Sequence, residues 1–282
     1  MSAASSSPDL PPLKDVIKRF GLGARKSLGQ HFLLDLNLCA KIAAAAGDVS
    51  GRTIIEIGPG PGGLTRALLD AGAGRVVAVE RDKRCVKALG ELAAAYPGRL
   101  EIIEGDALEM DCAAMGPAPR KIVANLPYNI ATPLLIGWLK QARKFEGLTL
   151  MFQKEVADRL TAEPATRAYG RLTVISRWLC DIRVAFNIDR RAFTPPPKVA
   201  SSVVNFAPRS RPLAAAEWMA LETVTAAAFG QRRKMLRGSL KVLDGDGNKL
   251  CRDAGIEPTL RAENLSVEQF CALARNMARN LI

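Results

Sequence analysis

The stretch Ile54-Ile-Glu-Ile-Gly-Pro-Gly-Pro-Gly-Gly-Leu-Thr65 decides the fold class of this chain. Its first four residues are three isoleucines around one glutamate, which is typical of a buried strand. The glycines that follow allow the backbone to turn tightly and to enter a helix at once. A glycine-rich turn between a strand and a helix also lets the backbone approach a bound nucleotide closely.

Outward from this stretch, short apolar runs alternate with amphipathic helical segments. The pattern predicts strands over residues 53–57, 75–79, 100–103, 121–124 and 148–152. It predicts intervening helices over residues 64–71, 83–96 and 132–143. This alternation indicates an α/β fold with a mostly parallel, doubly wound (Rossmann-like) sheet and helices on both faces. Two later runs, 182–186 and 201–206, would add strands at the end of the sheet.

Past Pro208-Arg-Ser-Arg-Pro212 the strand signal stops and the pattern becomes helical, over residues 214–229, 231–242 and 266–278. We therefore expect a domain boundary near residue 210. The Ser-, Ala- and Pro-rich start reads as a disordered leader over residues 1–13, followed by an α/β domain over 14–209 and a small all-helical domain over 210–282.

The composition restricts the possible functions. Forty Lys and Arg against 28 Asp and Glu give a net charge of +12, which favours a polyanionic partner such as nucleic acid. A single histidine, His31, and six cysteines without a C-x-x-C pair leave little for a metal site, so no metal is expected. No apolar run approaches the roughly 20 residues that span a bilayer, so we expect a cytoplasmic protein without membrane contact.

Acidic residues follow two of the predicted strands. Glu80 ends the second strand, 20 residues beyond Gly60, where a carboxylate can accept both hydroxyls of an adenosyl ribose. Asp106 ends the third strand and is suited to accept a hydrogen bond from an adenine amino group. These acids fit either NAD or S-adenosylmethionine (SAM). Pro59 and Pro61 remove two N–H donors that a phosphate would need, which favours SAM and leaves NAD as the alternative.

Asn125-Leu126-Pro127-Tyr128 follows the fourth predicted strand. An adenine amine is a poor nucleophile, so an enzyme that alkylates it must hold its hydrogens and direct its lone pair. The side-chain oxygen of Asn125 and the carbonyl of Leu126 or Pro127 can accept those hydrogens, and Tyr128 offers a ring on which an extruded base can stack. The alternative is a simple turn with a core tyrosine.

Two basic segments are candidates for RNA phosphate contacts. One is Arg25-Lys26, in a glycine-containing loop. The other places four positive charges within six residues at the start of a predicted helix, namely Arg232, Arg233, Lys234 and Arg237. The alternative reading of such a run is a solvated face.

Six segments, in this order and spacing, resemble the ribosomal RNA adenine N6,N6-dimethyltransferase family, and within it the bacterial enzymes of the small subunit. The resemblance runs from about Lys14 to the C-terminus. The segments are Gly29-Gln-His-Phe-Leu33, Glu56-Ile-Gly-Pro-Gly60, Val79-Glu80, Gly105-Asp-Ala107, Asn125-Leu-Pro-Tyr128 and Phe193-Thr-Pro-Pro-Pro-Lys-Val-Ala-Ser-Ser-Val-Val204.

The resemblance implies SAM-dependent dimethylation of two adjacent adenines in a 3′-terminal hairpin loop of small-subunit (16S) rRNA, within a partly assembled 30S subunit. Asn125 would be shared between SAM and the target amine, Tyr128 and Phe193 would enclose the base, and residues 210–282 would bind RNA. Many family members have Asn where this chain has His31. The resemblance places SAM on Gln30, His31, Leu33, Gly58, Gly60, Glu80, Asp106, Ala107 and Asn125.

Two other functions share these features. One is the related dimethyltransferase of large-subunit rRNA that confers macrolide resistance, although Gly255-Ile-Glu-Pro258 and Ala262-Glu-Asn-Leu-Ser266 are closer to the small-subunit enzymes. The other is a non-catalytic RNA-binding assembly or transcription factor with the same fold. The intact Asn125–Tyr128 motif argues against a pure binding protein. Since no long heptad pattern is visible, we expect a monomer.

Overall fold

The computed structural model describes residues 9–25 and 28–280. Residues 1–8 of the expected leader, and Lys26, lie outside the described residues. The chain divides into two compact units: unit 1 takes in the chain up to Lys154 and again 184–206, and unit 2 takes in 155–183 and the chain from Ala207 onward. The boundary predicted near residue 210 lies close to the point after Phe206 where the chain last passes from unit 1 to unit 2. The assignment of 155–183 to unit 2 differs from the expected single boundary.

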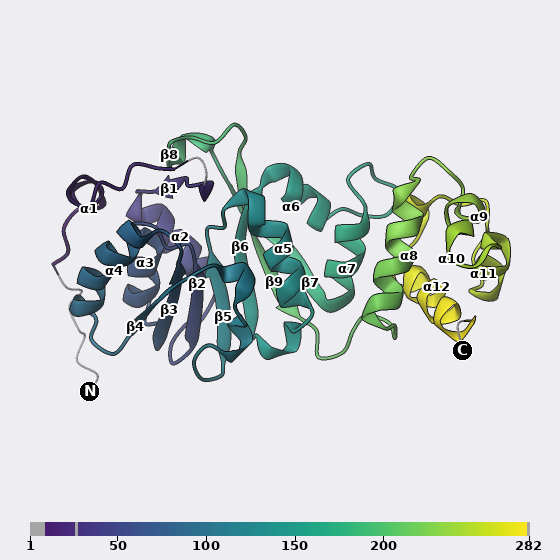
Figure 1. Cartoon of the computed structure of the whole chain (residues 1–282), viewed down its shortest axis with the longest axis horizontal. Helices are drawn as coiled ribbons and strands as arrows, with labels where there is room; N and C mark the ends of the chain where they lie inside the picture. The colour runs from purple at the N-terminus through teal and green to yellow at the C-terminus, as the bar shows by residue number, and fades with distance from the viewer. Residues whose placement is uncertain (1–8, 26–27, 281–282) are drawn as a thin grey trace. The chain divides into compact units, whose positions relative to one another are not determined.

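The centre of unit 1 is a sheet that has seven strands in the described part of the chain (Figure 1). The pairs among β2 to β6 are parallel, and β6 pairs antiparallel with β9. This confirms the predicted doubly wound α/β fold. In spatial order the strands are β4 (Leu100–Glu104), β3 (Arg75–Glu80), β2 (Thr53–Ile57), β5 (Arg120–Ala124), β6 (Gly147–Gln153), β9 (Ser201–Pro208) and β7 (Cys180–Ile188).

Helices cover both faces of this sheet. Right-handed crossovers that run in opposite directions from β2 and β5 put α3 (Gly63–Asp70) and α4 (Lys83–Ala95) on one face and α5 (Tyr128–Leu139) on the other. Helices α1 (Leu13–Arg19) and α2 (Leu36–Ala45) precede the sheet in the chain, and α2 packs on α3. One apolar cluster joins α2, α3 and α4 to the sheet residues Ile54, Val76, Val123, Met151 and Val203.

A two-stranded ribbon, absent from the sequence expectations, joins distant parts of unit 1. Strand β1 (Phe32–Leu33) pairs antiparallel with β8 (Phe193–Thr194), with Leu33 opposite Phe193. Because side chains alternate along a strand, Phe193 points into the apolar cluster and is 2% exposed, whereas Thr194 is exposed. The ribbon therefore attaches the segment before α2 to the Phe193-Thr-Pro-Pro-Pro stretch.

Unit 2 is helical and has its own apolar core, which includes Tyr169, Trp178, Val224, Leu236 and Phe270. The six cysteines of the chain are buried and are not joined in disulfides. No helix within 9–25 or 28–280 is long and apolar enough to cross a membrane. The helices that follow β6 are α6 (Lys154–Leu160), α7 (Arg171–Leu179), α8 (Trp218–Gly230), α9 (Leu236–Ser239), α10 (Lys241–Asp244), α11 (Gly247–Asp253) and α12 (Val267–Asn280).

The helix predicted over 231–242 is wrong in its first half. Residues after α8 form a turn, and α9 begins only at Leu236. The reason is tertiary: the Leu236 and Arg237 N–H groups donate to the carbonyls of Leu260 and Pro258, at 2.7 and 3.1 Å, instead of to the preceding turn of a helix. Arg232, Arg233 and Lys234 therefore lie in a turn between two helices.

The close approach of α9 and α11 generates a stability prediction. A Cβ at Gly247 would lie 2.5 Å from the Arg237 carbonyl oxygen, whereas a Cβ at Gly238 would make only ordinary contacts with Lys234. We expect Gly247→Ala to destabilise unit 2 by about 1–3 kcal/mol, because backbone atoms must separate. The control Gly238→Ala is in a helix and is expected to be neutral or stabilising by up to about 1 kcal/mol. Hydrogen exchange of the α9 and α11 amides measures both, and equal protection in the two variants would contradict the prediction.

Candidate cofactor and substrate site

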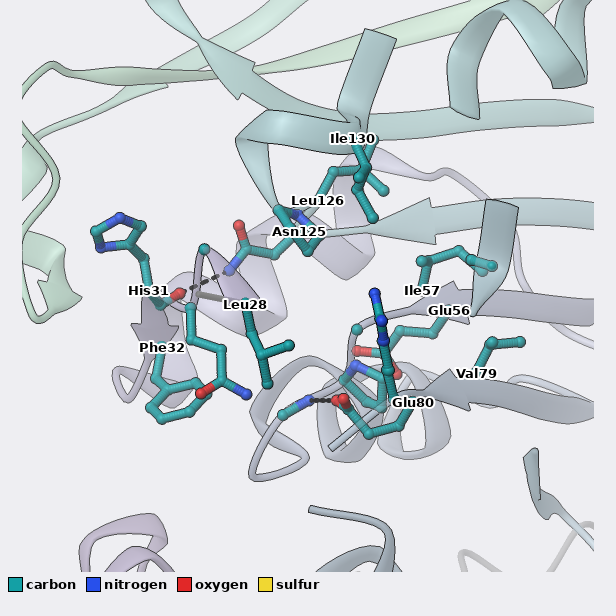
Figure 2. Close-up of a pocket in the computed structure, with 18 of the residues that line it drawn as sticks. Leu28, His31, Phe32, Glu56, Ile57, Val79, Glu80, Asn125, Leu126 and Ile130 are labelled. Atoms are coloured by element: carbon teal, nitrogen blue, oxygen red, sulfur yellow. Dashed lines mark hydrogen bonds between the residues drawn. The ribbon is translucent and has the colours of Figure 1, made fainter. Parts of the chain in front are cut away.

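A pocket in unit 1 lies at the carboxyl ends of β2, β3, β4 and β5, where the strand order reverses between β2 and β5 (Figure 2). This is the position at which doubly wound sheets bind their ligands. The structure brings most of the sequence-predicted site residues to this one pocket. Those that line it are Gln30, His31, Leu33, Gly58, Gly60, Glu80, Asp106, Ala107, Asn125, Leu126, Pro127 and Tyr128.

The glycine turn after β2 is held by the carboxylate of Glu80. The Gly60 N–H donates to Glu80 Oε2 at 3.0 Å, the dashed line at Glu80 in Figure 2. The Asp82 N–H donates to Glu80 Oε1 at 2.7 Å. Gly60 has a φ of +57°, and a Cβ there would lie 3.0 Å from the Phe32 ring, so this position requires glycine. The buried Glu80 carboxylate thereby ties the turn after β2 to the end of β3, and the Phe32 ring of β1 lies against the turn.

Burial raises the pKa of Glu80, and the N–H donors of Asp82 and Gly60 oppose that rise. Each of its oxygens accepts one backbone N–H and keeps a further lone pair. Since Glu80 lines the pocket, those lone pairs can accept hydrogen bonds from a ligand. The geometry suits hydroxyl donors, as the sequence analysis expects.

Glu56, for which the sequence suggested no role, is a further acidic residue of the pocket. It lies on β2 at 1% exposure, and its Oε2 has no hydrogen-bond partner among the described residues. Burial raises the pKa of Glu56 to about 8, and the neighbouring charge of Glu80 adds to the rise. A glutamate amid the isoleucines of a buried strand was the sequence signal that could have identified it.

Asp106 follows β4 and also has partners within the protein. Its Oδ1 accepts the Leu108 N–H at 3.0 Å, and its Oδ2 pairs with Arg81 at 3.0 Å. Ala107, the next residue, is buried against the pocket. A carboxylate held in this way keeps acceptor capacity for an amino group at the end of β4.

The Asn125 side chain has a defined orientation. Its Nδ2 donates to the His31 carbonyl at 3.1 Å, as Figure 2 shows. The amide nitrogen is thus used by the backbone, and Oδ1 is left as the acceptor of the pair. Pro127 precedes α5, and its carbonyl accepts the Ile130 N–H at 3.1 Å. Of the two backbone carbonyls considered in the sequence analysis, the structure therefore favours that of Leu126.

Tyr128 has a different ring partner from the one expected. Its ring stacks on His31, with centroids 5.7 Å apart and planes at 28°, and its Oη lies 2.6 Å from Ser201 Oγ. The His31 Nδ1 lies 2.7 Å from the Pro195 carbonyl oxygen. Phe193, predicted to enclose a base together with Tyr128, is not among the lining residues, because the ribbon turns it into the core.

The predicted RNA contacts are divided between the units. Arg25 is exposed on the segment before β1 in unit 1. In unit 2, Arg233, Lys234 and Arg237 are exposed, whereas Arg232 pairs with Glu263 at 2.9 Å and donates to the Thr166 carbonyl at 3.2 Å.

The raised pKa of Glu56 predicts a specific pH dependence of stability. A carboxyl whose pKa is higher in the folded chain stabilises the fold below its ordinary pKa near 4.5, and this contribution is lost as the pH rises towards 8. We expect Glu56→Gln, which resembles the protonated acid, to be increasingly more stable than the original chain between pH 5 and 8. Thermal melts across this range, with exposed Glu109→Gln as control, measure the difference. If the difference in melting temperature between Glu56→Gln and the original chain does not change with pH, the raised pKa of Glu56 is disproved.

Comparison with known proteins identifies a family that this chain matches. Residues 21–279 match the family described as ribosomal RNA adenine dimethylase. Two bacterial proteins named ribosomal RNA small subunit methyltransferase A are close relatives: that of Rhodospirillum rubrum is 62% identical over 98% of this chain and 95% of its own length, and that of Paramagnetospirillum magneticum is 64% identical over 97% of each.

Two solved structures agree with this assignment. A dimethyladenosine transferase from Plasmodium falciparum superposes with a TM-score of 0.77 at 28% identity, covering 89% of this chain and 99% of that one. The 23S rRNA methyltransferase ErmE superposes with a TM-score of 0.66 at 28% identity, covering 88% and 99%. The chain belongs to the ribosomal RNA adenine dimethylase family.

Proposed function

We propose that this chain transfers methyl groups from SAM to N6 of two adjacent adenines in a hairpin loop near the 3′ end of small-subunit (16S) rRNA, and so acts in ribosome biogenesis. Membership of the family supports the reaction, and the names of the relatives at 62% and 64% identity support the choice of subunit. The single observation that carries the proposal is the orientation of Asn125, whose nitrogen is bound to the His31 carbonyl so that its oxygen is the acceptor.

The residues of the pocket fit SAM. Glu80 keeps lone pairs for two ribose hydroxyls, and Asp106 keeps acceptor capacity for the adenine amine. Pro59 and Pro61 also line the pocket, so the turn lacks two N–H donors that a pyrophosphate would need. Bound SAM would supply a methyl group on a sulfonium sulfur. The residues that would hold it are Gln30, His31, Leu33, Gly58, Gly60, Glu80, Asp106, Ala107 and Asn125.

The chemistry on the adenine is mainly a matter of orientation. The Asn125 oxygen and the Leu126 carbonyl would accept the two hydrogens of the N6 amine, so that the nitrogen lone pair faces the methyl group. Bound SAM would supply the methyl carbon, whose bond to sulfur would be exchanged for a bond to this nitrogen, and the resulting cationic amine would lose a proton to water. No strong base is needed, in keeping with a chain whose one histidine ring is bound to the Pro195 carbonyl.

The extruded base would stack on Tyr128, whose ring is held by the contact of its hydroxyl with buried Ser201. His31 lies on a face of that ring. Phe193 does not line the pocket but packs in the core beside Leu33, its partner in the ribbon. Its role in this proposal is therefore to position β1 and not to touch the base.

RNA affinity would come from the basic segments. Exposed Arg25, Arg233, Lys234 and Arg237 are suited to contact phosphates, whereas Arg232 is already paired with Glu263. Lys26 belongs to the same proposed contact set. We infer that the substrate is rRNA in a partly assembled 30S subunit, that the protein works as a monomer, and that it does so in the cytoplasm.

The proposal is tested by transfer of radiolabelled methyl from SAM to small subunits that lack the modification, followed by nucleoside analysis. Four methyl groups per subunit, recovered as N6,N6-dimethyladenosine, are expected. Transfer only to large-subunit RNA would assign the chain to the resistance-type enzymes. Tight RNA binding without transfer would leave the non-catalytic factor as the explanation.

In the same assay we expect Asn125→Ala to lower turnover by about 100-fold or more, because the amine loses its acceptor. SAM affinity, measured by calorimetry, should weaken by less than about tenfold, because Glu80 and the glycine turn remain. Near-normal turnover in Asn125→Ala would contradict the proposed orientation of the adenine amine by Asn125.

The basic turn of unit 2 gives a matched pair of variants. Since each phosphate contact on single-stranded RNA contributes about 0.7 to the log–log salt slope, Arg233→Gln should reduce the slope by about that amount. Arg232→Gln should change the slope less and the melting temperature more, because it breaks the pair with Glu263. Filter binding at several salt concentrations and thermal melts distinguish the two. Equal slopes in Arg233→Gln and the original chain would remove this segment from the RNA interface.

A further inference from the structure

The described residues between α1 and β1, 20–25 and 28–31, include one wall of the pocket without belonging to the sheet. The last of them, Leu28 to His31, line the pocket, and Arg25 is exposed. A wall made from a loop keeps its shape only if contacts to a rigid element hold it. His31 is held by Asn125, Tyr128 and Pro195. The part of the loop before it is held by two residues at the start of α4, Asp82 and Arg84.

Arg84 binds the first half of the loop. Its Nη1 donates to the Gly21 carbonyl at 2.6 Å, and its Nη2 donates to the Gly23 carbonyl at 3.2 Å. Leu22, between these two glycines, is 1% exposed and packs with Val16 and with Cys85 of α4. The guanidinium therefore fixes both sides of a buried apolar anchor.

Asp82 binds the second half of the loop. Its Oδ2 accepts Gln30 Nε2 at 3.1 Å, and Gln30 Oε1 in turn accepts the Arg25 N–H at 2.9 Å. The two oxygens of Asp82 also accept a two-pronged contact from Arg84, Nε to Oδ1 at 3.0 Å and Nη2 to Oδ2 at 2.6 Å. The Asp82 side chain is 1% exposed, and the charged hydrogen bonds from Arg84 lower its pKa to about 2.

The same two residues are connected to the ribose end of the proposed SAM site. The Asp82 N–H donates to Glu80 Oε1, and its carboxylate caps α4 by accepting the Arg84 N–H at 3.1 Å. One short turn after β3 thus holds Glu80 through its backbone and the loop through its side chains. Neither Asp82 nor Arg84 lines the pocket.

We propose that Asp82 and Arg84 form a clamp that holds residues 20–25 and 28–30 against α4 and completes the SAM pocket, so that cofactor affinity depends on two residues that do not touch the cofactor. The inference rests on the proposed function. Both are positioning residues. His31, whose carbonyl orients Asn125, is held separately by its contacts with Pro195 and Tyr128, so the clamp acts on SAM binding and not on the alignment of the amine.

The test compares Arg84→Met, which keeps an unbranched apolar stem without the guanidinium, with Lys87→Met, which makes the same charge change at an exposed position of the same helix. We expect Arg84→Met to weaken SAM binding by about tenfold or more in calorimetry, and Lys87→Met to stay within about twofold. Amide exchange over residues 20–25 and 28–30 should accelerate in Arg84→Met only. At saturating SAM and RNA, kcat should stay within about threefold of the original chain, so the effect falls on the KM for SAM.

A second pair of variants keeps the test decisive if Arg84→Met does not fold. Arg84→Lys keeps the positive charge but cannot make the two-pronged contact with Asp82, and should give an intermediate loss of SAM affinity. Adding Gln30→Ala to either Arg84 variant should cost less than the sum of the single changes, because both act through one loop.

The outcomes separate the clamp from the proposed function. Unchanged SAM affinity in both Arg84 variants, or weaker binding without faster exchange over residues 20–25 and 28–30, would overturn the clamp. If the original chain itself fails to bind SAM in calorimetry, the proposed function fails and the clamp fails with it. If the original chain binds SAM and transfers methyl while Arg84→Met does so with unchanged KM, only the clamp is lost.

Discussion

The site depends on one buried carboxylate, that of Glu80, which accepts the N–H groups of Gly60 and Asp82. Parallel strands deliver their carboxyl ends to the same edge of a sheet, but this leaves the loops after them undefined. The two charge-assisted hydrogen bonds tie the turn after β2 to the turn after β3. The same turn after β3 carries Asp82 and Arg84, which hold the segment before β1. Removal of this carboxylate would therefore loosen three walls of the pocket at once.

Burial acts on the two glutamates of the pocket in different ways. Glu56 is surrounded by the sheet and gains little compensation, so burial raises its pKa to about 8. Glu80 is buried almost as deeply, but backbone donors oppose the rise. Burial thus favours the neutral form of both carboxyls, and at Glu80 the backbone donors offset part of this effect. This difference allows two acids on adjacent strands to share a small volume without full mutual repulsion.

The hydrophobic pattern of the sequence was sufficient to predict the structure where residues close in the chain determine it. Strand β2 has the predicted bounds, and the residues predicted at strand ends, including Glu80, Asp106 and Asn125, meet in one pocket. Pattern failed where distant partners decide. The turn before α9 exists because Leu260 and Pro258 accept the N–H groups of α9, and Phe193 is turned inward because it pairs with Leu33. Residues 155–183 join unit 2 through a core that includes Tyr169 and Trp178.

By itself, the sequence determined the alternation of strands and helices, the glycine turn and the acids at the strand ends, because spacing along the chain carries that information. It also determined the motif at Asn125 and the surplus of positive charge. Only the tertiary structure decided which atom of Asn125 is the acceptor, which basic residues are already paired, and what holds the loop over the pocket. The Asn125 contact joins residues 94 positions apart in the chain, and the Arg232 contact joins residues 31 positions apart. The Asp82–Arg84 contact lies within one buried turn. The geometry of all three follows from packing and not from composition.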